Sequence, residues 1–285
     1  MNTPQTINID NLPHLAARAQ NSNKGDFGSV GILGGAPGMV GATLLAGRAA
    51  LFSGAGRVYV GALDDRLLVD FTCPELMATS AESLPALPAP ACLVVGPGMG
   101  ISNRARRLLA TALGVEHALL LDADALNLIA RDTELMAALQ TRSADTLITP
   151  HPGEAARLLG IETQTIQLAR EDAIQHLVEL TGATVVLKGH NSLIQHPGKA
   201  IWRNSTGNAG MAAPGMGDVL TGVIAALIAQ GLTTEHAAVL GVWLHGQAGD
   251  EAASVAGTTG HSLAGLTASE LILFIRRGIA RMQTG

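Results

Sequence analysis

The segment 92–121, CLVVGPGMGISNRARRLLATALGVEHALLL, decides the fold class. Its two ends, 92–95 and 119–121, are short apolar runs typical of buried strands, and residues 103–113 between them have the apolar spacing of a helix. A helix that connects two strands in this way predicts a right-handed crossover and parallel pairing. The glycine-rich turn 96–100 follows the first strand, at the end where parallel sheets bind their ligands.

The same alternation of strands and helices continues along the chain. It predicts one α/β domain over residues 24–285, with a mainly parallel central sheet that helices cover on both faces. Residues 1–23 are polar and poorly patterned, so we expect an arm on the surface. The other strands are expected at 30–33, 58–60, 147–148 and 185–187, and the other helices at 42–53, 133–140, 154–159, 165–180, 218–229 and 236–252.

The composition argues against several classes of protein. The chain has 285 residues, of which 47% are hydrophobic, and a formal net charge of −5. Because no run of Lys or Arg stands out, we expect no nucleic-acid partner and no membrane partner. The most apolar run, 219–229, is too short to span a bilayer, and the N-terminus lacks the pattern of a signal peptide. The two cysteines, Cys73 and Cys92, are not spaced for a metal and fit a reducing compartment, so a cytoplasmic location is expected.

A candidate phosphate site is the stretch Pro214-Gly215-Met216-Gly217-Asp218, directly before an apolar helix. Glycines let backbone N–H groups converge on an anion, and the helix N-terminus adds a favourable dipole. Asp218 would then lie beside the phosphate and act as the base that takes a proton from a substrate hydroxyl. The alternative for Asp218 is an N-cap carboxylate.

Other polar side chains also follow predicted strands. Asp122 and Asp124 suit Mg²⁺ or a ribose hydroxyl, although helix capping is an alternative. Glu154 is expected to help hold a Mg²⁺ water and His151 to contact substrate, unless the histidine is a structural turn residue.

Three further features have both a functional and a structural interpretation. Lys188-Gly189-His190-Asn191-Ser192 offers a cation and several donors to phosphate or adenosine groups, or forms an exposed turn. The pair Asp64/Asp65 resembles a ribose-binding acid, but a solvated turn is favoured. His245 and Asp250 are interpreted as structural polar residues of a buried helix. Neither a P-loop nor a dinucleotide fingerprint is present, and the common serine hydrolase, zinc protease and thiol redox motifs are absent.

Taken together and in order, these motifs resemble the ADP/ATP-dependent NAD(P)H-hydrate dehydratases. The most specific piece is the segment 208–222, NAGMAAPGMGDVLTG. The resemblance implies a ribokinase-like fold, a three-layer α/β/α domain. It is carried by the stretches 24–35, 94–100, 121–127, 149–154, 186–191 and 208–222.

The resemblance also implies an activity and its partners. The nucleotide, ADP or ATP, would phosphorylate the ring hydroxyl of the S epimer of hydrated NADH or NADPH, and elimination of phosphate would restore the dihydronicotinamide. Mg²⁺ would neutralise phosphate charge, with Glu154 as a ligand. A separate epimerase would supply the S form, with spontaneous epimerisation as a second route, and a homo-oligomer, a tetramer, is expected.

Site residues follow from the same resemblance. Asp218 would be the base. Ala42, Gly98, His151 and Asp218 would contact the hydrate. The nucleotide would be held by the stretches 188–192 and 208–217, which contain Lys188, Gly189, His190, Asn191, Ser192, Asn208, Gly215, Met216 and Gly217.

Two other functions share these motifs. A ribokinase-like kinase of a hydroxymethyl vitamin precursor would use the same anion site and Asp218, but would release a phosphorylated product. A nucleotide-sensing module would bind the nucleotide without turnover. The sequence His151-Pro152-Gly153-Glu154 and the long loop 208–217 favour the dehydratase.

Overall fold

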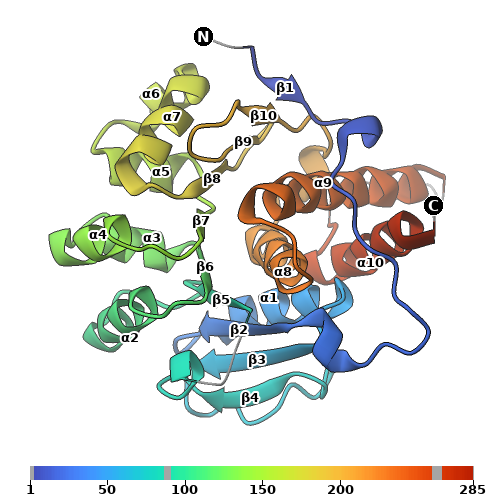
Figure 1. Cartoon of the computed structure of the whole chain (residues 1–285), viewed down its shortest axis with the longest axis horizontal. Helices are drawn as coiled ribbons and strands as arrows, with labels where there is room; N and C mark the ends of the chain where they lie inside the picture. Colours follow the sequence, from blue (N-terminus) through green and yellow to red (C-terminus); the bar gives the residue numbers. More distant parts are fainter. Residues whose placement is uncertain (1–2, 87–90, 259–264, 285) are drawn as a thin grey trace.

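The alternating strands and helices form one sheet with helices on both of its faces (Figure 1). The computed structural model describes residues 3–86, 91–258 and 265–284, and within them the sheet has ten strands in the order β1-β10-β9-β8-β7-β6-β5-β2-β3-β4. All neighbouring strands pair in parallel except β9, which is antiparallel to β8 and β10. The strands are β1 (Gln5–Thr6), β2 (Ser29–Gly34), β3 (Arg57–Ala62), β4 (Met77–Ser80), β5 (Cys92–Val95), β6 (Ala118–Leu121), β7 (Thr146–Ile148), β8 (Thr184–Leu187), β9 (Leu193–Gln195) and β10 (Trp202–Arg203).

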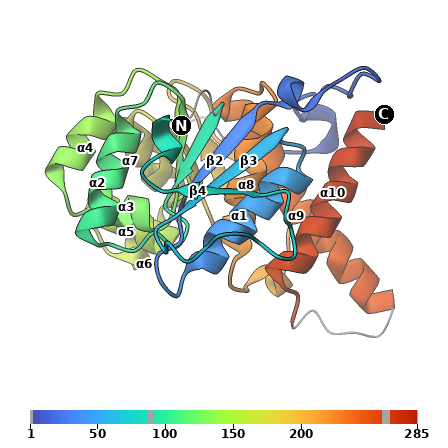
Figure 2. The same cartoon turned by 90° about the horizontal axis from the view of Figure 1, so that it is seen from below.

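Two helical layers enclose the sheet, as the view from below shows (Figure 2). α1, α8, α9 and α10 cover one face, and α2 to α7 cover the other. Because successive strand residues point to opposite faces, Val94 packs into the first layer, whereas Leu93 and Val95 pack into the second. None of the helices within the described ranges is long and apolar enough to cross a membrane. The helices are α1 (Val40–Phe52), α2 (Asn103–Leu113), α3 (Asp124–Ile129), α4 (Thr133–Gln140), α5 (Pro152–Leu159), α6 (Thr163–Leu168), α7 (Arg170–Thr181), α8 (Met216–Ala229), α9 (Thr234–Thr258) and α10 (Ala268–Thr284).

The strand order reverses beside β2, and this reversal fixes the place of the site. The chain moves from β2 outward to β3 and β4, and then returns to the other side of β2 with β5. The loops that follow β2 and β5 are held together, since Gly35 N donates to Pro97 O at 2.9 Å and Ala36 N donates to Gly98 O at 2.7 Å. Ligands of open parallel sheets bind at such a reversal, outside the carboxyl ends of the strands.

Every strand expected from the sequence is present, and one expected helix is divided. The segment 165–180 forms α6 and α7, which are separated at Ala169, where φ is −133° and ψ is 55°. The break lets Arg170 turn back to the sheet, where its Nη2 donates to Leu187 O at 3.0 Å and to Lys188 O at 3.3 Å. The elements β1, β4, β9, β10, α3 and α10 were not predicted, and most of them are short.

The N-terminal segment, expected to be a surface arm, is tied to the sheet at several points. β1 pairs in parallel with β10, matching Gln5 to Trp202. Further along, the side chains of Ile7 and Leu15 are buried in the core on the α8 face. The Arg18 guanidinium lies 3.8 Å from the centre of the Phe27 ring. The segment therefore extends the sheet and covers part of its core.

Candidate functional site

The N-terminus of α8 is open to an anion. Its N-cap is Gly215, in a left-handed conformation with φ 85°, and no side chain of the described ranges caps the helix. A side chain at Gly215 would be strained by the positive φ, and its Cβ would lie 2.5 Å from Leu45 Cδ1, which would have to move. Asp218 therefore lies inside the first turn, so the N-cap alternative for it is wrong. The backbone N–H groups of this turn remain available to a phosphate.

A buried group of charges lies beside this turn. Lys188 Nζ is 2.7 Å from Asp122 Oδ1 and 3.9 Å from Glu154 Oε2. Thr221 Oγ1, from α8, donates to Asp122 Oδ2 at 2.9 Å. Asp122 and Glu154 are only 1% and 4% exposed. Burial disfavours the ammonium form of Lys188, yet the two carboxylates raise the pKa of this lysine, so it stays charged.

Asp218 is tuned to accept a proton near neutral pH. Burial raises the pKa of Asp218 to about 7, and the negative charge of Asp122 adds to this effect, while Lys188 partly offsets it. A carboxylate with a pKa near the working pH is well suited to general base catalysis. The side chain is half-buried in the first turn of α8, beside the open helix terminus.

His151 and Glu154 form a reciprocal cap at the start of α5. The Nδ1 atom of His151 accepts the Gly153 N–H at 2.9 Å, and Glu154 Oε2 accepts the His151 backbone N–H at 2.7 Å. The Nε2 atom of His151 also lies 3.2 Å from Glu154 Oε1, so both ring nitrogens have a partner in this cap, as the structural interpretation expects. Its side chain is nevertheless 49% exposed, and burial together with Lys188 lowers the pKa of His151. The imidazole is thus neutral near pH 7 and can be approached by a ligand.

Two residues expected to contact the hydrate, Ala42 and Gly98, lie next to each other. Gly98 has a φ of 55°, and a Cβ added to it would be 2.5 Å from Met39 O and 3.1 Å from Ala42 Cβ. Only glycine therefore allows the turn after β5 to approach the start of α1 so closely. The two residues lie at the reversal of strand order.

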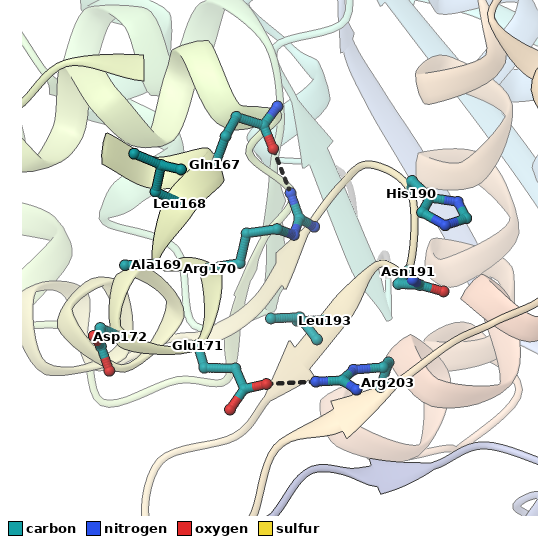
Figure 3. Close-up of a pocket in the computed structure, with 10 residues that line it drawn as sticks. All are labelled: Gln167, Leu168, Ala169, Arg170, Glu171, Asp172, His190, Asn191, Leu193 and Arg203. Atoms are coloured by element: carbon teal, nitrogen blue, oxygen red, sulfur yellow. Dashed lines mark hydrogen bonds and ion pairs between the residues drawn. The ribbon is translucent and has the colours of Figure 1, made fainter. Parts of the chain in front are cut away.

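The segment 188–192, which connects β8 and β9, faces in two directions. Lys188 points to the buried carboxylates, whereas His190 and Asn191 line a hollow of about 580 Å³ (Figure 3). On its other side the hollow is bounded by the junction of α6 and α7, where Arg170 contacts Gln167. Across its floor Glu171 forms an ion pair with Arg203. Ser192 Oγ donates to Gly189 O at 2.9 Å and so closes the turn.

The loop before α8 is anchored by α9. Asp250 accepts the Gly207 N–H at 2.9 Å and the Asn208 side-chain amide at 3.1 Å. His245 Nε2 is 3.0 Å from Met216 O, and burial lowers the pKa of His245 to about 4. The structural roles expected for His245 and Asp250 are confirmed. Both hold the loop that carries the candidate nucleotide-binding residues, and no local sequence signal indicated that connection.

Thr221 is a supporting residue that sequence analysis missed. It lies three positions after Asp218, on the same side of α8, so the helical period was the available signal. Asp122 and Asp124 were expected to bind Mg²⁺ or ribose. Asp122 contacts Lys188 and Thr221, and Asp124 accepts the Gly100 N–H at 2.8 Å.

The described residues offer Mg²⁺ only part of a coordination shell. No group of three or more His, Cys, Asp or Glu in ranges 3–86, 91–258 and 265–284 is arranged to hold a metal ion. Glu154 is already engaged by the His151 N–H and lies near Lys188. Mg²⁺ is commonly bound by one or two carboxylates together with substrate phosphates. The residues therefore fit an ion that arrives with a nucleotide.

The chain is similar in sequence to a known family of enzymes. A family model described as NAD(P)H-hydrate dehydratase matches residues 30–271. The chain is 43% identical over 260 residues to the ADP-dependent (S)-NAD(P)H-hydrate dehydratase of Neisseria meningitidis serogroup B, covering 89% of this chain and 87% of that protein. It is 40% identical over 254 residues to a bifunctional NAD(P)H-hydrate repair enzyme of Coxiella burnetii, covering 87% of this chain. The chain spans about half the length of that bifunctional relative, 51%.

Solved structures agree with the fold expected from the sequence. A ribokinase-like superfamily protein of Enterococcus faecalis superposes with a TM-score of 0.85 at 26% identity, covering 99% of this chain and 97% of that one. The ADP/ATP-dependent NAD(P)H-hydrate dehydratase of Bacillus subtilis, crystallised with ATP and Mg²⁺, superposes with a TM-score of 0.77 at 27% identity, covering 95% of this chain and 99% of that one. The expected ribokinase-like α/β/α fold is confirmed.

Proposed function

The chain belongs to the NAD(P)H-hydrate dehydratase family, and from this we propose that it uses ADP or ATP to dehydrate the S epimer of hydrated NADH and NADPH. The observation that carries the proposal is the open N-terminus of α8 with Asp218 in its first turn. A terminal phosphate of the nucleotide fits the free N–H groups. A base with a raised pKa then lies beside the phosphorus that is attacked.

The reaction has two steps on this geometry. Asp218 takes the proton of the ring hydroxyl, whose oxygen attacks the terminal phosphorus, and the nucleotide leaves one phosphate shorter. In the second step the C–O bond breaks, phosphate leaves with the electron pair, and loss of a proton from the neighbouring carbon forms the ring double bond. The protein contributes mainly position and charge, because phosphoryl transfer needs little covalent help.

The remaining residues have proposed roles at either ligand. Ala42, Gly98 and His151 contact the hydrate where the strand order reverses. The stretches 188–192 and 208–217 hold the nucleotide, with Gly215, Met216 and Gly217 at its phosphates. Mg²⁺ would be held by these phosphates and by Glu154, and when bound it neutralises phosphate charge.

The proposed partners follow from the substrate. Two epimers of a hydrated cofactor exist, and a site of fixed shape acts on one, so a separate epimerase is expected to supply the S form. Because nicotinamide cofactors are abundant in the cytoplasm, we expect the protein there. A homotetramer is expected, and light scattering on the purified protein measures its mass directly.

The test is recovery of dihydronicotinamide absorbance. Purified protein, Mg²⁺ and hydrated NADH are mixed with ADP, with ATP, or with no nucleotide. Recovery that requires a nucleotide supports the dehydratase and identifies the preferred phosphate donor. If nucleotide is bound but absorbance does not recover, and a hydroxymethyl vitamin precursor is phosphorylated instead, the protein is a kinase. Binding without any turnover would indicate the sensing module.

A further inference from the structure

Two aspartates at the end of β6 point to different parts of the site. Asp122 and Asp124 flank Ala123, which has a φ of 49° and a ψ of −116°. A non-glycine residue rarely adopts a positive φ, and such conformations persist only where the surroundings enforce them. The turn after β5 contributes to this, since a Cβ at Gly96 would lie 1.8 Å from Asp122 O. The unusual backbone separates the two carboxylates.

Asp122 is directed to the nucleotide side. It joins the end of β8, through Lys188 Nζ at 2.7 Å, to α8, through Thr221 Oγ1 at 2.9 Å. Lys188 is thereby held close to the start of α8. Its Nζ lies 3.4 Å from the position that a Cβ would take at Gly217. Without the charge of Asp122, the lysine would retain Glu154, at 3.9 Å, and the weaker influence of Asp218.

Asp124 is directed to the hydrate side. Its Oδ2 accepts the Gly100 N–H at 2.8 Å, and its Oδ1 accepts the amide of Asn127 at 3.2 Å. Arg157 of α5 donates to Asn127 at 2.7 Å and so extends the chain of hydrogen bonds to the helix that begins after His151. Gly100 has a φ of 69° and ends the turn that contains Gly98. Asp124 therefore fixes one end of the turn expected to contact the hydrate.

We propose that Asp122 and Asp124 are positioning residues for two different ligands, Asp122 acting on the nucleotide through Lys188 and Asp124 acting on the hydrate through Gly100. The ligand assignments rest on the proposed function, whereas the two sets of contacts do not. Neither aspartate needs to touch a ligand in order to act. Each should affect the affinity of one ligand and leave the other nearly unchanged.

The first measurement is calorimetric titration of the whole protein with Mg²⁺–ADP and, separately, with hydrated NADH. Loss of a hydrogen bond to a charged group corresponds to about ten- to a hundredfold in affinity. We therefore expect Asp122→Asn to lower the affinity for Mg²⁺–ADP by that factor and to change the affinity for hydrated NADH by less than about threefold. Asp124→Asn should lower the affinity for hydrated NADH about tenfold and keep the affinity for Mg²⁺–ADP within about threefold of the wild type. Equal losses for both ligands, or none for either, would overturn the proposal.

A double-mutant cycle tests whether Asp122 acts through Lys188. Lys188→Met should itself weaken ADP, and the double variant Asp122→Asn/Lys188→Met should be no weaker than Lys188→Met within about twofold. Independent, additive losses would contradict the proposed route. Asp122→Asn alone leaves a buried lysine without its main partner and could destabilise the fold. The double variant removes that lysine as well, so its ADP affinity can be measured without this defect. Thermal unfolding of each variant, with Asp65→Asn as an exposed aspartate control, establishes that the proteins are folded.

Hydrogen exchange separates this inference from the proposed function. Asp124→Asn should speed amide exchange at 98–100 and not at 188–192, and Asp122→Asn should do the reverse. If wild-type protein fails to repair hydrated NADH but this exchange pattern holds, the function is wrong and the positioning roles stand. If repair proceeds and the two variants exchange alike in both segments, the positioning roles are wrong and the function stands.

Discussion

Two pairs of acidic residues follow strands of the same sheet, and they differ in what neutralises them. Asp64 and Asp65 come after β3, where Arg66 and Arg104 pair with them in a surface turn. The Arg66 side chain is 81% exposed and the Asp65 side chain is 74% exposed. The Arg104–Asp65 pair contributes little, because water competes for the exposed Asp65 carboxylate, whereas the Asp64 side chain is only 8% exposed. The solvated turn expected here is confirmed for Asp65.

Among the residues that the structure describes, no arginine pairs directly with the two aspartates after β6. Asp122 contacts an ammonium and a hydroxyl, and Asp124 contacts a backbone N–H and an amide. These partners belong to the segments that carry the candidate ligand contacts. An acidic pair at a strand end is therefore informative only once its partners are known.

The largest effect is expected from Asp218, which lies near the buried Asp122. Asp218→Asn should lower kcat about 10²- to 10⁴-fold, because the base is removed while the shape of the side chain is kept. The affinity for Mg²⁺–ADP should stay within about threefold, as measured by calorimetry. Turnover close to that of the wild type would remove Asp218 as the base.

A large loss of stability is expected where the backbone supports Asp122. Gly96→Ala forces a Cβ against Asp122 O at a residue whose φ is 128°, so it should cost about 3–5 kcal/mol from strain and overpacking together. Gly182→Ala is the matched control, because Gly182 also has a positive φ, 67°, but nothing lies within 4 Å of its Cβ position. The control should lose only about 1–2 kcal/mol in urea unfolding. Equal losses would show that the contact with Asp122 contributes nothing.

A moderate effect is expected from pH. Since the pKa of Asp218 is raised to about 7, kcat/KM should rise with pH through about 7 as the base loses its proton. The folded state binds this proton more tightly than the unfolded state. The free energy of unfolding therefore falls as pH rises from the ordinary pKa of an aspartate, 3.8, to about 7. Asp218→Asn should therefore melt a few degrees higher than the wild type at pH 8. A single group titrates mostly within roughly one pH unit of its pKa. If kcat/KM does not change between about pH 5.5 and 8, Asp218 is therefore not the base.

The smallest effect is expected at the exposed Asp65. Asp65→Asn should change the free energy of unfolding by less than about 0.5 kcal/mol and leave turnover unaltered. Its partner Arg104 keeps its bonds to Glu82 and to Leu63 O. A clear loss of turnover in Asp65→Asn would mean that the surface turn takes part in the site, which would break the distinction between the two pairs.

Most of the fold could be predicted from the sequence because the predicted strands are short apolar runs that end in Gly, Pro or Asp. The break at Ala169 could not, since residues 165–180 have a continuous helical period and the interruption depends on Arg170 reaching carbonyls of β8. The two-residue strands β1 and β10 were missed for a related reason. Two residues are too few to show a period, and their pairing depends on a distant segment.

The members of the site could be predicted more readily than their contacts. Asp122, Glu154, Lys188 and Asp218 each follow a strand or begin a helix at the same edge of the sheet, so their gathering follows from topology. The directions of Asp122 and Asp124 depend on the positive φ of Ala123. An alanine in the sequence does not predict a positive φ, so the pairing of Lys188 with Asp122 could not be predicted. Likewise, capping by Asp218 was excluded only by where α8 begins.

The pairing of β1 with β10 has a consequence for synthesis. Gln5 is matched to Trp202, so β1 is synthesised well before the strand with which it pairs. At a translation rate of about 5–20 residues per second, the first strand waits on the order of ten seconds or more before its partner has left the ribosome. During that interval Ile7 and Leu15, buried in the finished protein, have no core to enter. Docking of the N-terminal segment is therefore expected to be a late event in folding, after the parallel sheet has formed.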